Sequence, residues 1–193
     1  MRLARPFYEQ STVEVARQLL GKYLVRVQAD GVMAGMILET EAYVGVEDKA
    51  SHASRGRTPR NGVMFGPAGF AYVYMIYGMH HCLNIVTEQE DYPAAVLIRA
   101  VEPCEGIELM RRRRRLQDGR RLTNGPGKVC QAFEIDRRLN GLDACGETLF
   151  IEDRGSGPVD IVATTRVGVE YAGPWKDMPW RFYIACHPGV SKR

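Results

Sequence analysis

Two carboxylates and a tyrosine share one face of the extended stretch of residues 32–44. Alternation along a strand puts Glu39, Glu41 and Tyr43 on one side and Thr40 and Ala42 on the other. Carboxylates beside an aromatic ring can activate a water molecule and stabilise an oxocarbenium-like sugar, which is the chemistry of glycosidic bond hydrolysis. The alternative is that both glutamates lie at a strand edge that faces solvent.

An arginine interrupts the apolar stretch of residues 94–101. Arg99 directly follows Val96-Leu97-Ile98, and a run of this kind is typical of a central strand. An arginine that is buried in such a strand needs a partner. The carboxylate of Glu41 fits this role, and the two side chains could hold a water molecule between them.

The other reactive side chains do not form a metal or nucleotide motif. His80 and His81 are adjacent, so they point to opposite faces of a strand and cannot easily share one metal ion. The five cysteines include no pair with the two-residue gap of zinc or redox motifs, which favours buried, reduced thiols. The sequence also has no Walker pattern and no dinucleotide-binding glycine pattern. We therefore expect catalysis that does not depend on a metal.

Positive charge and aromatic rings are interleaved in residues 49–87, a segment without Asp or Glu. Its basic side chains include Arg55, Arg57 and Arg60. Such a pattern suits a phosphate backbone and stacked bases. The other interpretation is a pair of strands that fills the core with tyrosine. A second basic block, residues 111–115 with Arg120 and Arg121, is either a solvated helix end or an extension of the nucleic-acid surface.

Tyr77 fits the core interpretation poorly because it belongs to a predicted turn, Tyr77-Gly78-Met79-His80. A large side chain at the tip of a hairpin, flanked by apolar Ile76 and Met79, has the shape of a wedge. Wedges of this kind enter the minor groove of DNA and unstack a base step. An enzyme that acts on a base in duplex DNA must extrude that base, and a wedge fills the gap.

The composition describes an ordinary globular protein. Of the 193 residues, 45% are hydrophobic and 25% are charged, with a formal net charge of +3. These values exclude a disordered tail, a collagen-like chain and a coiled coil. The longest apolar run is far shorter than a membrane span, and the first residues lack the apolar stretch of a signal peptide. We expect one domain that covers residues 1–193.

Short elements separated by turns must position the reactive residues. Ser11 and Glu14 have capping-box spacing, which predicts a helix that ends at Gly21. Further helices are predicted to open at Glu102-Pro103 and after Gly125-Pro126-Gly127. The predicted strands are residues 23–27, 32–44, 70–76, 81–86, 94–101, 148–152, 159–164 and 180–185. This order favours an α+β fold with a mostly antiparallel sheet.

Motifs along nearly the whole chain resemble the alkyladenine (3-methyladenine) DNA glycosylase family, in its bacterial form. They run in order from about residue 3 to about residue 190. The motifs are Ile37-Leu38-Glu39-Thr40-Glu41-Ala42-Tyr43, Thr58-Pro59-Arg60-Asn61, Tyr72-Val73-Tyr74-Met75-Ile76-Tyr77-Gly78-Met79, Leu83-Asn84-Ile85, Leu97-Ile98-Arg99-Ala100-Val101-Glu102-Pro103, Gly125-Pro126-Gly127-Lys128 and Arg166-Val167-Gly168-Val169.

The resemblance implies a fold and an activity. The fold is a single compact domain with a curved, partly open barrel-like antiparallel sheet, surrounding helices and a protruding hairpin that inserts into DNA. The activity is removal of damaged purines of the 3-methyladenine type, with ethenoadenine and hypoxanthine as further candidates, by hydrolysis of the N-glycosidic bond without any cofactor. The implied partner is damaged double-stranded DNA, bound by a monomer in the bacterial cytoplasm, with no membrane association.

The resemblance also implies a role for each matched catalytic residue. Glu41 matches the general base that activates the attacking water. Arg99 matches the arginine that helps to hold this water, and the carbonyl of Val167 matches a further ligand to it. Glu39 lies on the same strand face as Glu41, but no family role attaches to it.

The binding residues follow from the same motifs. Tyr43, His52 and Tyr74 match the walls of the pocket for the flipped base, and Asn84 matches a residue whose bulk disfavours normal guanine. Residues expected at the DNA are the intercalating Tyr77, its neighbour Met79, and the phosphate-binding candidates Arg60 and Lys128.

Two other classes of protein remain open from the residues alone. A non-catalytic module for RNA or single-stranded nucleic acid would also use aromatic and basic side chains. Such a module has no need for Glu41 opposite Arg99, because a carboxylate near phosphates repels them. A metal-dependent nuclease is the second alternative, and activity in excess chelator would exclude it.

Overall fold

The computed structural model describes residues 1–116 and 121–191 of the chain. Its strands are β1 (Tyr23–Gln28), β2 (Gly31–Val44), β3 (Ala71–Ile76), β4 (His80–Val86), β5 (Ala94–Glu105), β6 (Leu149–Glu152), β7 (Ile161–Thr164) and β8 (Arg181–Ile184). The α-helices are α1 (Arg5–Tyr8), α2 (Thr12–Gln18), α3 (Ile107–Arg114) and α4 (Pro126–Ala132). Short 3-10 helices are η1 (His52–Arg55), η2 (Gly62–Phe65), η4 (Arg137–Leu139) and η5 (Glu170–Asp177).

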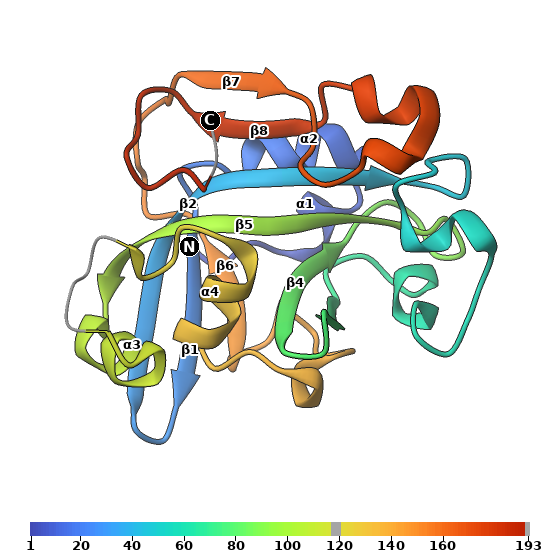
Figure 1. Cartoon of the computed structure of the whole chain (residues 1–193). Coiled ribbons are helices and arrows are strands. Elements are labelled where there is room, and N and C mark those ends of the chain that lie inside the picture. The colour runs from blue at the N-terminus through green and yellow to red at the C-terminus, as the bar shows by residue number, and fades with distance from the viewer. Residues whose placement is uncertain (117–120, 192–193) are drawn as a thin grey trace.

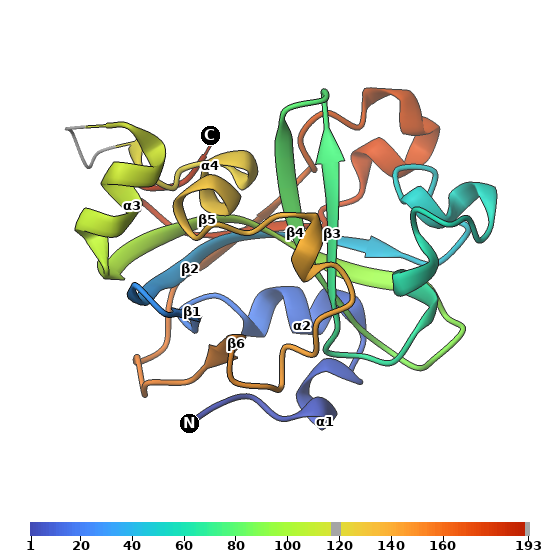
Figure 2. The same ribbon diagram turned by 90° about the horizontal axis from the view of Figure 1, so that it is seen from below.

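The strands form one antiparallel sheet that curls into a half-barrel, with helices around it (Figures 1 and 2). The main path of the sheet is β3-β4-β5-β2-β1-β6, and β8 pairs with both β2 and β7. Strands from all parts of the chain therefore build a single domain. The predicted α+β class and antiparallel sheet are confirmed, and every predicted strand is present within a few residues of its expected bounds.

The long strand β2 changes partner at the point where its carboxylates begin. Its first half pairs with β1 up to Met36, and β8 takes over at Glu39. The register between β2 and β5 shifts at the same place, between Ile37 and Thr40. Such irregularities re-aim side chains and are over-represented beside active sites. From Glu39 onward the expected alternation holds, since Thr40 Oγ1 donates to the Ala16 carbonyl of α2 while Glu39 and Glu41 contact Arg99.

The main core lies between the sheet and α2. Val15 of this helix and Leu19 at its C-cap are fully buried, and they belong to one hydrophobic cluster with Leu38 of β2 and Ile98 of β5. The predicted helix is therefore present. Its predicted capping box is not, because the Ser11 side chain makes no cap hydrogen bond.

Glu88 caps α2 instead of Ser11. Its carboxylate accepts a 3.0 Å hydrogen bond from the main-chain N–H of Thr12 and another from the Thr12 hydroxyl. A carboxylate from a distant loop thus supplies the acceptor at this helix start, a tertiary contact that local spacing cannot reveal.

The helix start predicted at Glu102-Pro103 is wrong. Both residues extend β5, which continues to Glu105, and α3 begins only at Ile107. The turn between strand and helix occurs at Gly106, whose φ of 67° favours glycine. Pro103 is tolerated in the strand because it pairs with Gly35 directly beside a register shift, where the ladder is irregular.

The second basic block lies at the end of α3. Arg111 pairs with Glu108 in the same helix, and Arg113 pairs with Asp30 and Glu134. These ion pairs fit the interpretation of a solvated helix end for this part of the block. Arg120 lies outside the described residues. The later helix predicted after Gly125 is confirmed as α4.

Candidate active site

Glu41 is fully buried and holds three hydrogen-bond donors. Its Oε2 accepts from the Tyr43 hydroxyl at 2.8 Å and from Nη1 of Arg99 at 3.2 Å, and its Oε1 accepts from the main-chain N–H of Val167 at 2.7 Å. The predicted pairing of Glu41 with Arg99 is therefore present. The structure also shows a contact that the sequence did not suggest, because Val167 meets Glu41 through its N–H.

Glu39 is buried as deeply as Glu41 and is bound by more charged groups. Its Oε1 accepts from Nε of Arg99 at 2.8 Å and from Nε of Arg181 at 2.7 Å. The main-chain N–H of Ser191 donates to Oε2 at 2.7 Å, and the Ser191 hydroxyl donates to Oε1 at 2.9 Å. The alternative of a glutamate pair at a solvent-facing strand edge is therefore wrong for both residues, which have no exposed surface.

The carboxylates of Glu39 and Glu41 and the guanidinium groups of Arg99 and Arg181 thus form one buried cluster. Burial alone disfavours the charge on Arg99, but Glu41 and then Glu39 outweigh it and hold the pKa of Arg99 above its ordinary value. Burial, together with the neighbouring Glu41 charge, raises the pKa of Tyr43 well above its ordinary value. The Tyr43 phenol therefore stays protonated and donates to the carboxylate.

A cavity of about 300 Å3 opens in front of these groups. The three residues that bind Glu41 all line it, whereas Glu41 lies behind them. The lining also includes the predicted pocket residues and the predicted wedge. The lining residues are Tyr43, Ala50, His52, Met64, Tyr72, Tyr74, Ile76, Tyr77, Cys82, Asn84, Leu97, Arg99, Pro126, Val167, Gly168, Val169 and Tyr171. A small number of polar groups in a largely apolar and aromatic cavity is the usual form of a ligand site.

Three aromatic rings form one wall of this cavity. The His52 and Tyr74 ring centroids are 4.4 Å apart, and those of Tyr72 and Tyr74 are 5.3 Å apart. Nδ1 of His52 lies 2.8 Å from the Tyr72 hydroxyl. Partial burial of the ring, and beyond that the charge of Arg60, lower the pKa of His52 to about 4. The imidazole is therefore neutral at physiological pH.

Tyr72 and Asn61 were not singled out as site residues from the sequence. Tyr72 lines the cavity, and its hydroxyl lies 2.8 Å from Nδ1 of His52. Asn61 is buried, and its Nδ2 donates to the carbonyls of His52 and Gly56 at 2.9 Å each, which fixes the loop that carries His52. A buried asparagine in a loop rich in glycine and proline is the signal that indicates such an anchor.

Asn84 lies on β4 opposite Tyr72 of β3. It is 4% exposed, and its Nδ2 donates to the Tyr72 carbonyl at 3.2 Å. This bond holds the amide at the cavity wall, because both the side chain and its acceptor belong to paired strands. Asn84 is thus part of a rigid surface.

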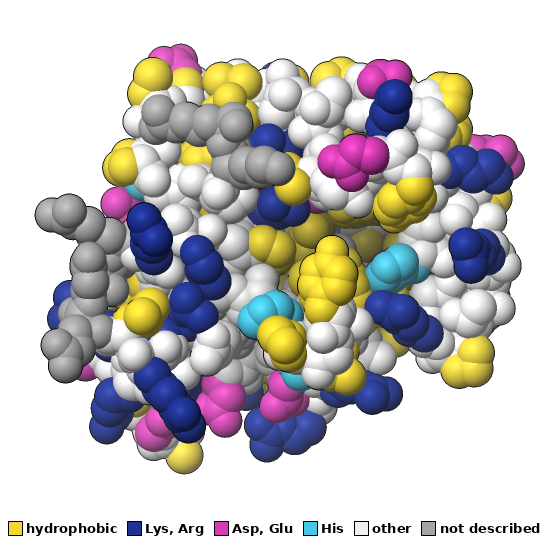
Figure 3. Space-filling view, viewed as in Figure 1, with side chains coloured by type: hydrophobic (Ala, Val, Ile, Leu, Met, Phe, Trp, Pro, Cys, Tyr) yellow, Lys and Arg dark blue, Asp and Glu magenta, His cyan; other side chains and the backbone are white. Residues whose placement is uncertain are grey.

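The turn between β3 and β4 carries one aromatic and one apolar residue that are strongly exposed. Tyr77 is 84% exposed and Met79 is 71% exposed. Tyr77 has φ 54°, a left-handed conformation that is uncommon for a side chain of this size. Tyr77 lines the cavity, whereas Met79 lines a separate groove beside α4. Figure 3 shows hydrophobic side chains around a hollow in the middle of this face, with Lys and Arg to either side.

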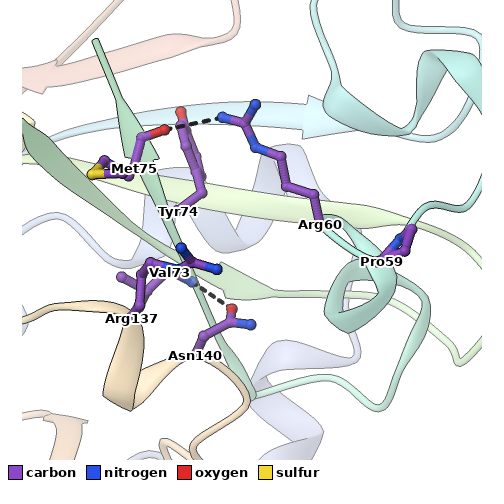
Figure 4. A pocket seen from close by; sticks show the side chains of 7 residues that line it. All are labelled: Pro59, Arg60, Val73, Tyr74, Met75, Arg137 and Asn140. Atoms are coloured by element: carbon purple, nitrogen blue, oxygen red, sulfur yellow. Dashed lines mark hydrogen bonds between the residues drawn. The ribbon is translucent and has the colours of Figure 1, made fainter. Parts of the chain in front are cut away.

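The two candidate phosphate-binding residues lie outside the cavity. Arg60 reaches the Met75 carbonyl at 3.1 Å, and its guanidinium lies 5.3 Å from the centroid of the Tyr74 ring (Figure 4). It therefore supports the back of the aromatic wall. Lys128 of α4 follows Pro126, a residue of the cavity lining, by two positions. Its Nζ donates to Oδ1 of Asn124 at 2.7 Å.

Two negative findings concern the residues that the structure describes. Among residues 1–116 and 121–191, no group of three His, Cys, Asp or Glu side chains is arranged to hold a metal ion. Over the same described part of the chain, no helix has the length and apolar character needed to cross a bilayer.

Comparison with known proteins decides the family. Residues 6–188 match the family described as methylpurine-DNA glycosylase. The chain belongs to the methylpurine-DNA glycosylase family. Relatives of this glycosylase include proteins whose names carry 3-methyladenine DNA glycosylase as an inferred activity. One from Methanocella arvoryzae is 55% identical, covering 99% of this chain and 96% of the relative.

Two further relatives carry the same inferred name. The protein from Desulfitobacterium hafniense is 49% identical to this glycosylase over 98% of each chain. The protein from Alkaliphilus oremlandii is 47% identical over 100% of each chain. The resemblance stated from the motifs is therefore confirmed at the level of the family and of the enzyme class, and the glycosylase spans essentially the whole length of these relatives.

Proposed function

We propose that this glycosylase flips alkylated or otherwise damaged purines out of duplex DNA and hydrolyses their N-glycosidic bond with an activated water, which starts base excision repair. The observation that carries the proposal is the buried Glu41 carboxylate directly behind an aromatic cavity, held by Arg99, Tyr43 and the Val167 N–H. A fixed carboxylate at the end of a base-sized aromatic pocket suits attack on the sugar of a base stacked there.

The acceptor capacity of Glu41 leaves room for the water. An ionised carboxylate has about four acceptor positions. Among the residues that the structure describes, Oε2 uses two of these positions for Tyr43 and Arg99, whereas Oε1 accepts from Val167 alone. A water at the open position of Oε1 lies beside Val167, whose carbonyl is the further ligand that the family implies. Glu41 takes a proton from this water, and its charge offsets the positive charge that develops on the sugar.

The aromatic wall favours alkylated bases. An alkylated purine carries positive charge, which gains from the π-faces of Tyr43 and Tyr74. His52 adds to this wall without a competing charge, because its pKa of about 4 keeps it neutral. Asn84, held by the Tyr72 carbonyl, meets the exocyclic amino group of normal guanine and disfavours it. The pocket thus selects 3-methyladenine-type lesions, with ethenoadenine and hypoxanthine as further candidates.

The exposed turn performs the extrusion. Tyr77 fills the gap left by the flipped nucleotide, and Met79 packs beside it in the groove. Arg60, whose guanidinium lies beside the Tyr74 ring, and Lys128, two residues after Pro126 of the cavity lining, meet flanking phosphates. We further propose that the protein acts as a monomer on the DNA of the cytoplasmic nucleoid.

A panel of single-lesion duplexes tests the proposal. The duplexes are incubated with the protein and then treated with alkali, which cleaves abasic sites. Strand breaks should appear at damaged purines, and the same activity should persist in excess chelator. A non-catalytic single-strand binding module would give no cleavage at any lesion. A metal-dependent nuclease would lose its activity with the chelator. Either result contradicts the proposed function.

A further inference from the structure

Arg166 is a buried, heavily hydrogen-bonded side chain near Glu41 that the proposed mechanism does not use. The side chains of Arg166 and of its partner Asp48 are both fully buried. Nη1 donates to Oδ2 of Asp48 at 2.5 Å and to the Ala42 carbonyl at 2.9 Å. Nη2 donates to Oδ1 of Asp48 at 2.8 Å and to the Trp175 carbonyl at 3.1 Å.

These bonds join four segments around the cavity, which are the segment of Arg166 itself and those of its three partners. Ala42 belongs to β2 between Glu41 and Tyr43, Asp48 to the loop before η1, and Trp175 to η5. The face of the guanidinium also lies 4.8 Å from the centroid of the Tyr43 ring and 5.1 Å from that of Trp180. A planar fork that binds a carboxylate with two nitrogens while stacking on rings is a property of arginine that lysine lacks.

Asp48 extends the same clamp into the loop that leads to His52. Its Oδ2 accepts from the Val44 N–H at 3.2 Å, and its Oδ1 accepts from the Ala50 N–H at 3.0 Å. Arg166 therefore fixes, through one buried ion pair, both the loop on one side of the cavity and the segment that carries Val167 on the other. Val167 in turn donates its N–H to Oε1 of Glu41 at 2.7 Å.

We propose that Arg166 is a positioning residue for catalysis, which holds the Val167 N–H against Glu41 and the Tyr43 ring in the cavity wall. This inference rests on the proposed function, because the residue whose surroundings Arg166 positions is Glu41, the general base of that proposal. Without the clamp, the segment of Val167 can move away from the carboxylate. Glu41 then loses one of its three donors and the water loses its place beside Val167.

The clamp has a consequence that a merely structural role would not produce. Loss of the Val167 N–H removes one of the donors that fix the Glu41 carboxylate, which acts in the chemical step. The rate of excision at saturating enzyme should therefore fall more than the affinity for damaged duplex. The turn that carries Tyr77, which is proposed to meet the DNA, lies between β3 and β4, outside the segments that the clamp joins.

Single-turnover excision by Arg166→Lys at saturating enzyme, with binding of the same damaged duplex measured in parallel, tests the inference. We expect a rate that is roughly 10- to 100-fold lower, the scale of a small misplacement of reacting groups. The affinity for the duplex should change less than the rate. A wild-type rate in folded Arg166→Lys, or a loss of affinity as large as the loss of rate, overturns the inference.

Two further variants make the outcome clear. Asp48→Asn preserves the size of the side chain and an acceptor for the loop, and it should lower the rate more than the affinity in the same way if Arg166→Lys does not fold. Arg26→Lys is the matched control, because Arg26 is also buried but binds the Thr148 carbonyl at 3.1 Å, far along β1 from the cavity. It should excise at the wild-type rate, and a loss of rate as large as that of Asp48→Asn would contradict the inference.

Glu41→Gln, measured in parallel, separates this inference from the proposed function. If Glu41→Gln excises normally, the proposed function fails. If Glu41→Gln is inactive and the Arg166 and Asp48 variants excise at the wild-type rate, only the positioning role of Arg166 fails.

Discussion

Replacement of Glu39 by Gln should destabilise the fold strongly, and the loss should depend on pH. Glu39 is fully buried and accepts from Arg99, Arg181 and Ser191. Gln preserves the size of the side chain but removes the charge that compensates two buried guanidinium groups. Removal of one partner from a buried ion pair typically costs about 3–5 kcal/mol. Because Gln retains an acceptor oxygen, we expect a loss at the lower end, about 3 kcal/mol in the free energy of unfolding.

The sign of the pH dependence follows from the pKa of Glu39. Burial raises this pKa, but Arg99, Ser191 and Arg181 together outweigh burial and hold it below the ordinary 4.5. A carboxylate whose pKa is lower in the folded state stabilises the fold fully above the unfolded pKa. It loses this contribution as the pH falls from about 4.5 through the lower folded pKa. The gap between wild type and Glu39→Gln should therefore be largest at neutral pH and shrink on acidification.

Urea unfolding followed by tryptophan fluorescence measures this gap at a series of pH values. Glu105→Gln is the matched control, because Glu105 makes a partly exposed ion pair with Arg154. Its loss should stay within about 1 kcal/mol. A gap below about 1 kcal/mol for Glu39→Gln at neutral pH, or a gap that stays constant on acidification, would refute the reasoning.

Three further predictions concern the cavity and its entrance. Tyr77→Ala should weaken action on duplex substrate by roughly 1–3 kcal/mol, the scale of one base–aromatic stack, and weaken action on single strands less; equal losses on both would rule out the wedge. Borohydride should trap no protein–DNA cross-link, because water is the proposed nucleophile and no described residue lining the cavity is a lysine; a clear cross-link would contradict this mechanism. Asn84→Ala should raise the release of undamaged guanine relative to alkylated purines by about 10- to 200-fold at most, and an unchanged ratio would remove Asn84 from selectivity.

The sequence predicts most of the sheet because its strands carry local signals. The alternation around Glu41 and the apolar run before Arg99 each specify an element without reference to distant residues. The partnership of Glu41 with Arg99 was also predictable, since an arginine inside an apolar strand requires a counter-charge. The structure brings the two together because β2 and β5 are neighbours.

Contacts between distant segments were beyond local reasoning. The capping of α2 by Glu88 and the binding of Glu39 by Ser191 join residues 76 and 152 positions apart. The start of α3 was misplaced because Glu102-Pro103 is a strong helix-start signal, whereas strand pairing with Gly35 and Met36 continues through it. Val167 was expected to act through its carbonyl, and only the folded chain shows its N–H on Glu41.

Single-turnover excision by Glu41→Gln tests the central claim most directly. Gln preserves the size of the side chain but removes its basicity, and a general base contributes roughly 100- to 10,000-fold to the rate. We predict a loss of at least this size on damaged duplex, with binding of the same duplex preserved or tightened because a negative charge near DNA phosphate is removed. The surface variant Glu105→Gln should excise at the wild-type rate. Excision by Glu41→Gln near the wild-type rate would show that the water is activated elsewhere and would contradict the account.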